Sequence, residues 1–262
     1  MPQTSATLNI MLATARKAAR TLARDFGEVE NLQVSRKGPS DFVSSADLKV
    51  EKTVFEELSR ARPGYGFLME ERGEVEGSDK SHRWIVDPLD GTTNFLHGVP
   101  HFAISLALER DGVLVAGVVY NVVRDELFWA EKGAGAYLND RRLRVAARLD
   151  LRDALFATGA PYHGKAGHDV FLQEVERVIA RTAGVRRFGA ASLDLAYVAA
   201  GRFDGFWERS LAAWDVAAGA VLVREAGGFV KEIDGGDFMK TGAIVASNER
   251  LLPLLTQTLR GS

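Results

Sequence analysis

The segment Trp84–Phe95 constrains the fold more than any other part of the chain, because two aspartates follow directly after a short apolar run. Its first three residues are large and apolar, which favours a buried strand. Pro88, between Asp87 and Asp90, fixes one backbone torsion, and Gly91 permits a tight bend immediately afterwards. The sequence therefore predicts a strand whose end holds both carboxylates toward one point.

Two carboxylates held toward one point are suited to Mg²⁺. This hard cation takes oxygen ligands at about 2.0–2.1 Å, usually a few carboxylates, with water and substrate phosphate completing its coordination. If Thr92 and Thr93 begin a helix, their free backbone N–H groups form a phosphate site beside the metal. Asp-Pro and Asp-Gly also occur in ordinary turns before a threonine helix cap, so either dipeptide alone indicates only a turn. The complete string favours a combined metal and phosphate site.

Three further acidic positions are candidates for the same site. Glu70, followed by Glu71, ends an apolar run, where a strand terminus presents a carboxylate; a solvated run of charge is the alternative. Asp215 begins a nearly all-apolar helix, either as a helix cap or as a metal ligand, because carboxylates are rarely buried without a partner. Asp47 begins an earlier helix, where an ordinary first-turn acid is the simpler interpretation. Local sequence alone leaves these alternatives open.

Hydrophobic periodicity predicts two halves of different texture. Apolar residues at three- and four-residue steps indicate amphipathic helices over residues 8–26 and 48–58, with a mobile loop predicted between them at Lys37–Ser40. Short apolar runs separated by turn sequences predict a largely antiparallel sheet with strands at Trp84–Val86, Ala103–Leu108, Val113–Tyr120 and Leu127–Ala130. Later strands alternate with helices predicted at Phe171–Ile179, Leu193–Ala200 and Asp215–Glu225. We therefore expect an N-terminal α+β half over residues 1–143 and a C-terminal α/β half over residues 144–262.

Composition excludes several classes of function. Lysine and arginine number 33 against 35 acidic residues, a net charge of −2, without the basic excess that attracts nucleic acid or anionic lipid. The chain contains no cysteine, which excludes disulfides, thiolate metal ligands and thiol nucleophiles. The sequence shows neither a signal-peptide pattern nor the roughly 20 apolar residues needed to span a bilayer. We expect a cytoplasmic protein with neither nucleic acid nor a membrane as its partner.

Taken together, these residues resemble the inositol monophosphatase family of magnesium-dependent, lithium-sensitive phosphatases, in order and in spacing along nearly the whole chain. The family's Glu-Glu motif matches Glu70-Glu71, its Asp-Pro-(Ile/Leu)-Asp-Gly-Thr motif matches Asp87–Thr92, and its Trp-Asp helix motif matches Trp214-Asp215. The resemblance implies a layered α-β-α-β-α sandwich, commonly a homodimer. It also implies that the chain removes phosphate from a small phosphorylated metabolite, with inositol monophosphate as the first expectation.

The resemblance further implies roles for individual residues. Two or three Mg²⁺ ions would be bound by Glu70, Asp87, the Leu89 carbonyl, Asp90 and Asp215. Glu70 and Thr92 would hold the nucleophilic water, and Asp47 would support an additional ion. The substrate would contact a set that includes a carboxylate for sugar hydroxyls: Gly91, Thr92, Thr93, Gly189, Ala190, Ala191 and Glu208. Two positions depart from common family patterns, with Met69 for a frequent glycine and Gly189-Ala190-Ala191-Ser192 for Gly-Ser-Ala-Ala.

The expected chemistry is hydrolysis by a metal-activated water. Phosphate-monoester hydrolysis needs strong electrostatic stabilisation, which two metal ions roughly 3.5–4 Å apart can supply without a phosphoenzyme. Ser192 and Ser210 lack a nucleophile-elbow motif. Fructose 1,6-bisphosphate, histidinol phosphate and phosphorylated nucleotides stay open as substrates, because related phosphatases share this metal core. Outside enzymes, the alternative is a regulatory binding protein that keeps the fold; loss of a metal-binding acid would favour it, and none is missing.

Overall fold

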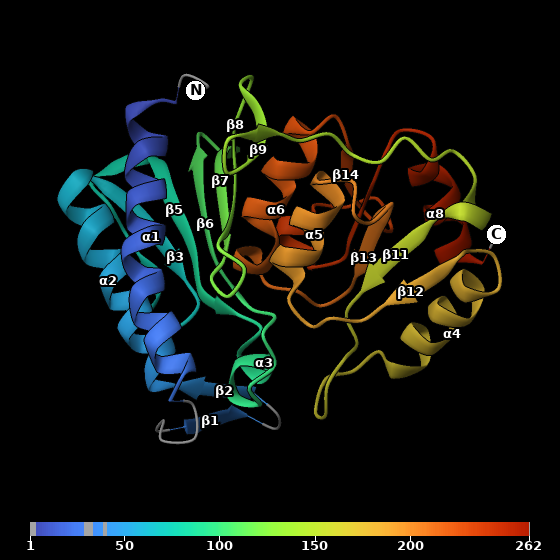
Figure 1. Ribbon diagram of the computed structural model, residues 1–262, viewed down its shortest axis with the longest axis horizontal. Coiled ribbons are helices and arrows are strands. Elements are labelled where there is room, and N and C mark those ends of the chain that lie inside the picture. The colour runs from blue at the N-terminus through green and yellow to red at the C-terminus, as the bar shows by residue number, and fades with distance from the viewer. Residues whose placement is uncertain (1–3, 29–33, 39–40, 262) are drawn as a thin grey trace.

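The computed structural model describes residues 4–28, 34–38 and 41–261. Its elements stack in five layers, in the order helices, sheet, helices, sheet, helices (Figure 1). Three groups of buried apolar side chains fill the spaces between these layers. The predicted α-β-α-β-α sandwich is confirmed.

The first layer is a pair of helices, α1 (Ala6–Phe26) and α2 (Ser45–Ala61), as their apolar periodicity predicts. Ser5 caps α1 by accepting a hydrogen bond from the Leu8 amide. The buried faces of both helices pack against one side of the first sheet (Figure 1).

Between α1 and α2 the structure has a two-stranded hairpin, β1 (Val34–Gly38) and β2 (Asp41–Ser44). The prediction of a loop is therefore wrong for Lys37 and Gly38, whereas residues 39–40 lie outside the described part of the chain. The sequence of β1 is polar and short, so it carries no apolar alternation from which a strand can be recognised.

The first sheet has eight strands in the order β10-β9-β8-β7-β6-β5-β3-β4. β3 and β5 run parallel and the other neighbouring pairs run antiparallel, which confirms the largely antiparallel sheet. Asp111 and Gly112 both have positive φ in the tight turn between β6 and β7. The strands are β3 (Tyr65–Met69), β4 (Gly73–Val75), β5 (Asp79–Asp90), β6 (Ala103–Arg110), β7 (Val113–Asn121), β8 (Glu126–Glu131), β9 (Gly135–Leu138) and β10 (Arg141–Arg142).

The middle layer consists of α5 (Ala191–Ala199) and α6 (Ala213–Glu225), which lie between the two sheets (Figure 1). Small residues let these elements approach closely. A Cβ added to Gly117 on β7 would lie 2.6 Å from the Ala218 carbonyl oxygen of α6, and one added to Gly219 would lie 2.5 Å from Leu195 Cβ on α5. Helix α6 therefore packs on the sheet almost backbone to backbone.

The second sheet has five strands in the order β12-β11-β13-β15-β14, with β11 parallel to β12 and β13. Helices α4 (His168–Ile179) and α8 (Leu251–Arg260) cover its outer face (Figure 1). This α/β texture confirms the prediction for the second half. The remaining elements are α3 (Thr92–Leu96), η2 (Leu151–Asp153), β11 (Leu155–Thr158), β12 (Gly184–Arg186), β13 (Gly205–Glu208), β14 (Phe229–Glu232), α7 (Phe238–Thr241) and β15 (Ile244–Ser247).

The two sheets divide the chain in sequence, because the strands of the first precede residue 143 and those of the second follow residue 154. One apolar core nevertheless contains side chains from both, including Ile85 and Phe206. The boundary between residues 143 and 144 therefore stays a prediction. In the described part of the chain, every helix is too short or too polar to cross a membrane.

The close approach of β7 and α6 generates a stability prediction. Gly117→Ala places a methyl group against the α6 backbone, which cannot move aside like a flexible side chain, so we expect a loss of about 1–3 kcal/mol of unfolding free energy. Gly27→Ala is the matched control, because Gly27 has helical torsions at the end of α1 and the added methyl makes only ordinary contacts. Denaturant titration of both variants measures the difference, and equal stabilities would contradict the packing described here.

Candidate active site

A cleft of about 890 Å³ opens where β3 and β5 end, opposite the loops that lead into α5 and α6. Residues from both halves of the chain line it. Three of the predicted metal ligands and six of the predicted substrate residues are among them: Glu70, Asp90 and Asp215, and Gly91, Thr92, Thr93, Gly189, Ala191 and Glu208. The structure thus brings most of the predicted site to one place.

Asp87 and Asp90 lie at the end of β5, where a bulge interrupts its pairing with β6. Both side chains are buried, with 1% and 8% exposure, and Asp87 lies beneath the cleft surface. The Oδ1 atom of Asp87 accepts a hydrogen bond of 2.9 Å from the Leu89 amide. Burial raises the pKa of Asp87 well above its usual range, and the charges of Glu70, Asp90 and Asp215 raise it further. These four acids therefore lie close enough to repel one another.

Asp90 also binds the amino end of α5. Its Oδ2 atom accepts hydrogen bonds from the Ser192 amide at 2.8 Å and from the Ser192 hydroxyl at 2.5 Å. The residue at the cap position of α5 is Ala190, whose side chain cannot cap the helix. Burial raises the pKa of Asp90, while the amides of this helix turn lower it. Asp90 thus replaces the missing helix cap and joins the two halves of the chain.

Glu70 and Asp215 approach from other elements. Glu70 follows β3, and its amide donates to the Val86 carbonyl at 3.2 Å, which places it beside the end of β5. Asp215 accepts a hydrogen bond of 2.7 Å from the Ala212 amide, so the cap interpretation of this residue is confirmed. Burial, followed by the charge of Asp90, raises the pKa of Asp215 to about 7. Asp215 also lines the cleft, and its carboxyl contacts the side chain of Asp87.

The Thr92 side chain connects the start of α3 to Asp47. Helix α3 begins at Thr92 as predicted, after Gly91 in a left-handed conformation, but it is only five residues long. The Thr92 hydroxyl lies 3.0 Å from the Leu89 carbonyl and 3.2 Å from Asp47 Oδ1, so its single proton is directed to one of these two oxygens. Asp47 is fully buried in the first turn of α2 and does not line the cleft.

The predicted substrate residues line the same cleft as the acids, with one exception. Ala190 is buried and does not line the cleft, whereas Gly189 and Ala191 do. Burial and the charges of Asp215 and Asp90 raise the pKa of Glu208 to about 8. Its carboxylate lies directly against Gly159, where any added Cβ would overlap it. Gly159 therefore decides where the Glu208 carboxylate can lie.

Several residues of the site carry no recognisable local signal. Ser192 is fully buried and donates its hydroxyl proton to Asp90, so it serves as a positioning residue rather than as an accessible nucleophile. Asn94 donates to the carbonyls of His101 and Phe188, both at 2.8 Å, and ties α3 to the loop before α5. Lys165 and Arg187 line the cleft and lower the pKa of Glu208 through their positive charges. Their contributions depend on long-range contacts that spacing cannot predict.

The donor set fits a hard divalent cation. Within the described residues, no three histidine or acidic side chains already form a ready ligand cluster. The four acids are nevertheless close enough to oppose one another's ionisation, and their donors are carboxylate oxygens, joined by the Leu89 carbonyl. Mutual repulsion of this kind is relieved when a cation lies among the carboxylates.

Comparison with known proteins decides the family. The inositol monophosphatase family matches residues 3–262, nearly the whole chain. The sequence is 61% identical over 257 residues to an inositol-1-monophosphatase of Mesorhizobium japonicum, covering 98% of this chain and 97% of that protein. The chain belongs to the inositol monophosphatase family. As a member of this metal-dependent phosphatase family, it is a phosphoric monoester hydrolase.

Two further proteins are similar to this chain over nearly its whole length. The crystal structure of extragenic suppressor protein suhB from Bartonella henselae superposes with a TM-score of 0.95 at 58% identity, covering 98% of this chain and 99% of that one. Nus factor SuhB of Pseudomonas aeruginosa is 45% identical, covering 97% of this chain and 95% of that protein. The first comparison shows that the whole chain shares the fold of that protein.

The raised pKa values predict how the metal-free protein responds to pH. Asp215 and Glu208 hold protons to about pH 7 and 8 in the folded state but release them near their ordinary values when unfolded. The folded state therefore binds more protons between about pH 4 and 8, and stability falls as pH rises through this range. The acids with lowered pKa, such as Asp79 at about 2, are already ionised there and do not offset the loss.

Thermal unfolding in a chelator at pH 5 and pH 8 measures this effect. We expect a lower melting temperature at pH 8, recovery on addition of Mg²⁺, and a smaller pH dependence in Asp215→Asn. A melting temperature that does not change with pH or with Mg²⁺ would show that the acids do not repel one another in the folded protein.

Proposed function

We propose that this member of the inositol monophosphatase family hydrolyses myo-inositol monophosphate to myo-inositol and phosphate with Mg²⁺. The observation that carries the proposal is the approach of Glu70, Asp87, Asp90 and Asp215, from distant parts of the chain, beside a cleft that Glu208 also lines. The four acids suit cations and phosphate, and a further carboxylate in the same cleft suits a polyol.

The ligands proposed for two or three Mg²⁺ ions are the acids that line or underlie the cleft, together with one carbonyl: Glu70, Asp87, Leu89, Asp90 and Asp215. All are oxygen donors, as Mg²⁺ prefers. When bound, the ions supply positive charge that stabilises phosphoryl transfer and makes a water more acidic. In this proposal Asp47, buried behind Thr92, supports an additional ion through the Thr92 hydroxyl.

The chain's own groups handle the water and its proton. The Thr92 hydroxyl gives its only proton to the Leu89 carbonyl or to Asp47, so its lone pair is left to accept a hydrogen bond from water in the cleft. Glu70 lines the same cleft and is the base that receives the proton of that water. The amides that begin α3, at Thr92 and Thr93, have no carbonyl four residues earlier within the helix and are directed to the phosphate.

Glu208 is proposed to orient the alcohol. A carboxylate accepts hydrogen bonds from two neighbouring hydroxyls of a polyol ring; burial raises the pKa of Glu208, and the positive charges of Arg187 and Lys165 offset part of that rise. Relatives at about 60% identity carry the name inositol-1-monophosphatase, which favours inositol phosphate over fructose 1,6-bisphosphate, histidinol phosphate and nucleotides. We further propose that the protein is a lithium-sensitive, cytoplasmic homodimer without a nucleic-acid or membrane partner. It acts as a catalyst rather than as a regulatory protein, because all the metal-binding acids are present.

Phosphate release from a panel of esters tests the proposal. We expect Mg²⁺-dependent, lithium-inhibited hydrolysis, highest for inositol 1-phosphate. Asp90→Asn should lower kcat by roughly 10²–10³-fold or more because it removes a negative charge from the site. The folded structure should survive, since an Asn carbonyl oxygen still accepts both hydrogen bonds from Ser192. An Asp90→Asn variant with full activity would exclude the metal site proposed here.

The position of Glu208 against Gly159 gives a second test. Gly159→Ala forces the carboxylate from its position, so we expect KM for inositol 1-phosphate to rise about tenfold, the loss of one hydrogen bond to a charged group. Ethyl phosphate, which has no hydroxyls for Glu208, is the matched substrate and should be unaffected. Steady-state kinetics with both esters separates the outcomes: an equal change for the two esters would mean that Glu208 does not orient the polyol.

A further inference from the structure

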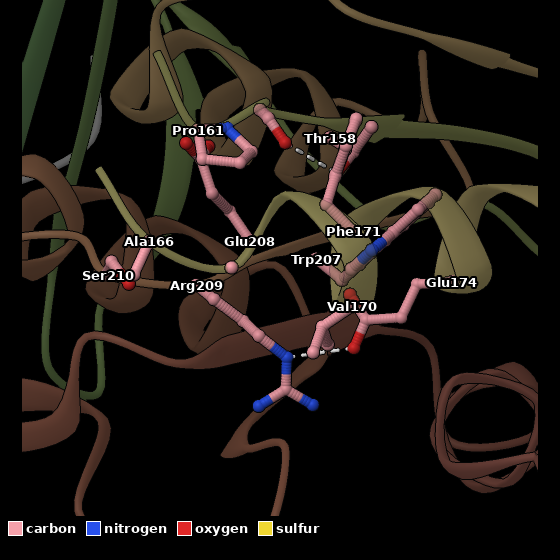
Figure 2. Close-up of a pocket in the computed structure, with 12 residues that line it drawn as sticks. Thr158, Pro161, Ala166, Val170, Phe171, Glu174, Trp207, Glu208, Arg209 and Ser210 are labelled. Atoms are coloured by element: carbon pink, nitrogen blue, oxygen red, sulfur yellow. Dashed lines mark hydrogen bonds and ion pairs between the residues drawn. The ribbon is translucent and has the colours of Figure 1, made fainter. Parts of the chain in front are cut away.

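A second, smaller cavity of about 170 Å³ lies beside the cleft, between α4 and the end of β13 (Figure 2). We call it the side pocket. It shares five wall residues with the cleft: Gly159, Pro161, Glu208, Arg209 and Ser210. The residues that belong to its walls alone are Thr158, Ala166, Gly167, Val170, Phe171, Glu174 and Trp207. A ligand that occupies the cleft at Glu208 therefore has the side pocket next to it.

The side pocket suits a small flat ring. Its walls are mostly apolar, with Val170 and Phe171 from α4, Trp207 from β13, and Pro161 on the far side of Glu208 (Figure 2). An engineered apolar cavity of about 150 Å³ is known to bind benzene, so this volume holds one aromatic ring and excludes a larger ring system. Aromatic walls favour such a ring through stacked or edge-to-face contacts.

Apart from Glu208, which also lines the cleft, the charges in the wall are already paired, so the side pocket favours a neutral occupant. The Arg209 Nε atom donates to Glu174 at 2.8 Å, and its Nη1 atom donates to Asp234 at 2.7 Å. Figure 2 shows Arg209 and Glu174 joined along the wall. Burial raises the pKa of Glu174, so negative charge is already unfavourable at this place. The same burial would oppose a second, unpaired negative charge on a ligand. Beyond Glu208, neither a cation nor an anion has a free counter-charge inside.

One polar donor in the wall has no acceptor. Trp207 is fully buried, and its indole N–H lies near Glu174 and lowers the pKa of that carboxyl. No acceptor in the described residues meets this N–H at hydrogen-bonding geometry. The indole nitrogen lies within the wall beside Glu174 and is not exposed to the cavity, so it makes no demand on an occupant of the side pocket.

We propose that the side pocket is a substrate subsite for a single neutral aromatic ring, carried by the alcohol part of a phosphorylated polyol. Aryl glycoside phosphates have this chemistry: phosphate at the acids, sugar hydroxyls at Glu208, and the aryl group beyond it. The inference rests on the proposed phosphatase function and extends it to a substrate class. The carboxylate of Glu208 forms the partition between sugar and ring, and Gly159 leaves the space in which it lies.

Two substrates that differ only in the ring test the subsite. The two substrates are phenyl and methyl β-D-glucopyranoside 6-phosphate. We expect kcat/KM to be roughly tenfold or more higher for the phenyl glycoside, as expected for burying apolar groups in a fitted pocket. A ratio below about twofold, alongside normal hydrolysis of inositol 1-phosphate, overturns the subsite and leaves the proposed function in place.

A matched pair of variants on α4 locates the effect. Val170 is 46% exposed at the rim of the side pocket, so Val170→Trp closes the pocket without disturbing the core; Leu172 is 62% exposed on the same helix outside it. Val170→Trp should abolish the preference for phenyl while inositol 1-phosphate hydrolysis changes less than twofold. Leu172→Trp should keep the preference. A preference that survives Val170→Trp places the ring elsewhere and overturns the proposal.

Binding without turnover separates this inference from the proposed function. In saturation-transfer NMR, the ring protons of unphosphorylated phenyl β-D-glucopyranoside should receive saturation from the wild-type protein and from Leu172→Trp, but not from Val170→Trp. If this pattern holds while no ester is hydrolysed, the side pocket is confirmed as a ring site and the phosphatase proposal fails. If all three proteins give the same signal, the side pocket does not bind the ring.

Discussion

The contact between the Asp90 carboxylate and the amino end of α5 is the interaction on which the site depends. Helix α5 begins at a position where Ala190 supplies no side-chain cap, and an acid from β5 accepts the hydrogen bonds instead. Because β5 belongs to the first sheet and α5 lies between the sheets, this contact holds the two walls of the cleft at a fixed separation. The same carboxylate faces the other acids, so one side chain sets both the helix position and the local charge.

The acids oppose the stability of the protein that holds them. Asp87 is almost fully buried with three other acids near it, and its pKa is raised by burial and by their charges. Such an arrangement persists only where the surrounding structure is over-determined. Here the close packing of Gly117 against α6, and of Gly219 against α5, fixes the scaffold behind the acids. A cation among the carboxylates converts their repulsion into attraction, so binding and folding are linked through the same atoms.

Local patterns in the sequence predict the elements and the acidic motif, but not the contacts between them. Asp87, Asp90 and Thr92 are recognisable because an apolar strand, a tight bend and a helix start follow one another within twelve residues. The polar hairpin of β1 and β2 lacks such a pattern. Ser192 cannot be assigned from spacing, because its partner Asp90 lies 102 residues earlier. Gly159 has the same limitation, since the reason for a glycine there is the carboxylate of Glu208. Long-range partners decide roles that local sequence leaves open.

Glu208 belongs to two surfaces at once, and this has a consequence for specificity. The residue lines both the cleft and the side pocket, and its carboxylate lies against Gly159. A ring bound in the side pocket restricts the conformations of the Glu208 side chain before a polyol binds. A bound polyol likewise restricts the conformations of this side chain before the ring binds. Because such coupling is reciprocal, each group strengthens the binding of the other by the same factor. On this proposal, selectivity for the alcohol depends on the space around one carboxylate, whereas the phosphoryl chemistry depends on the acids.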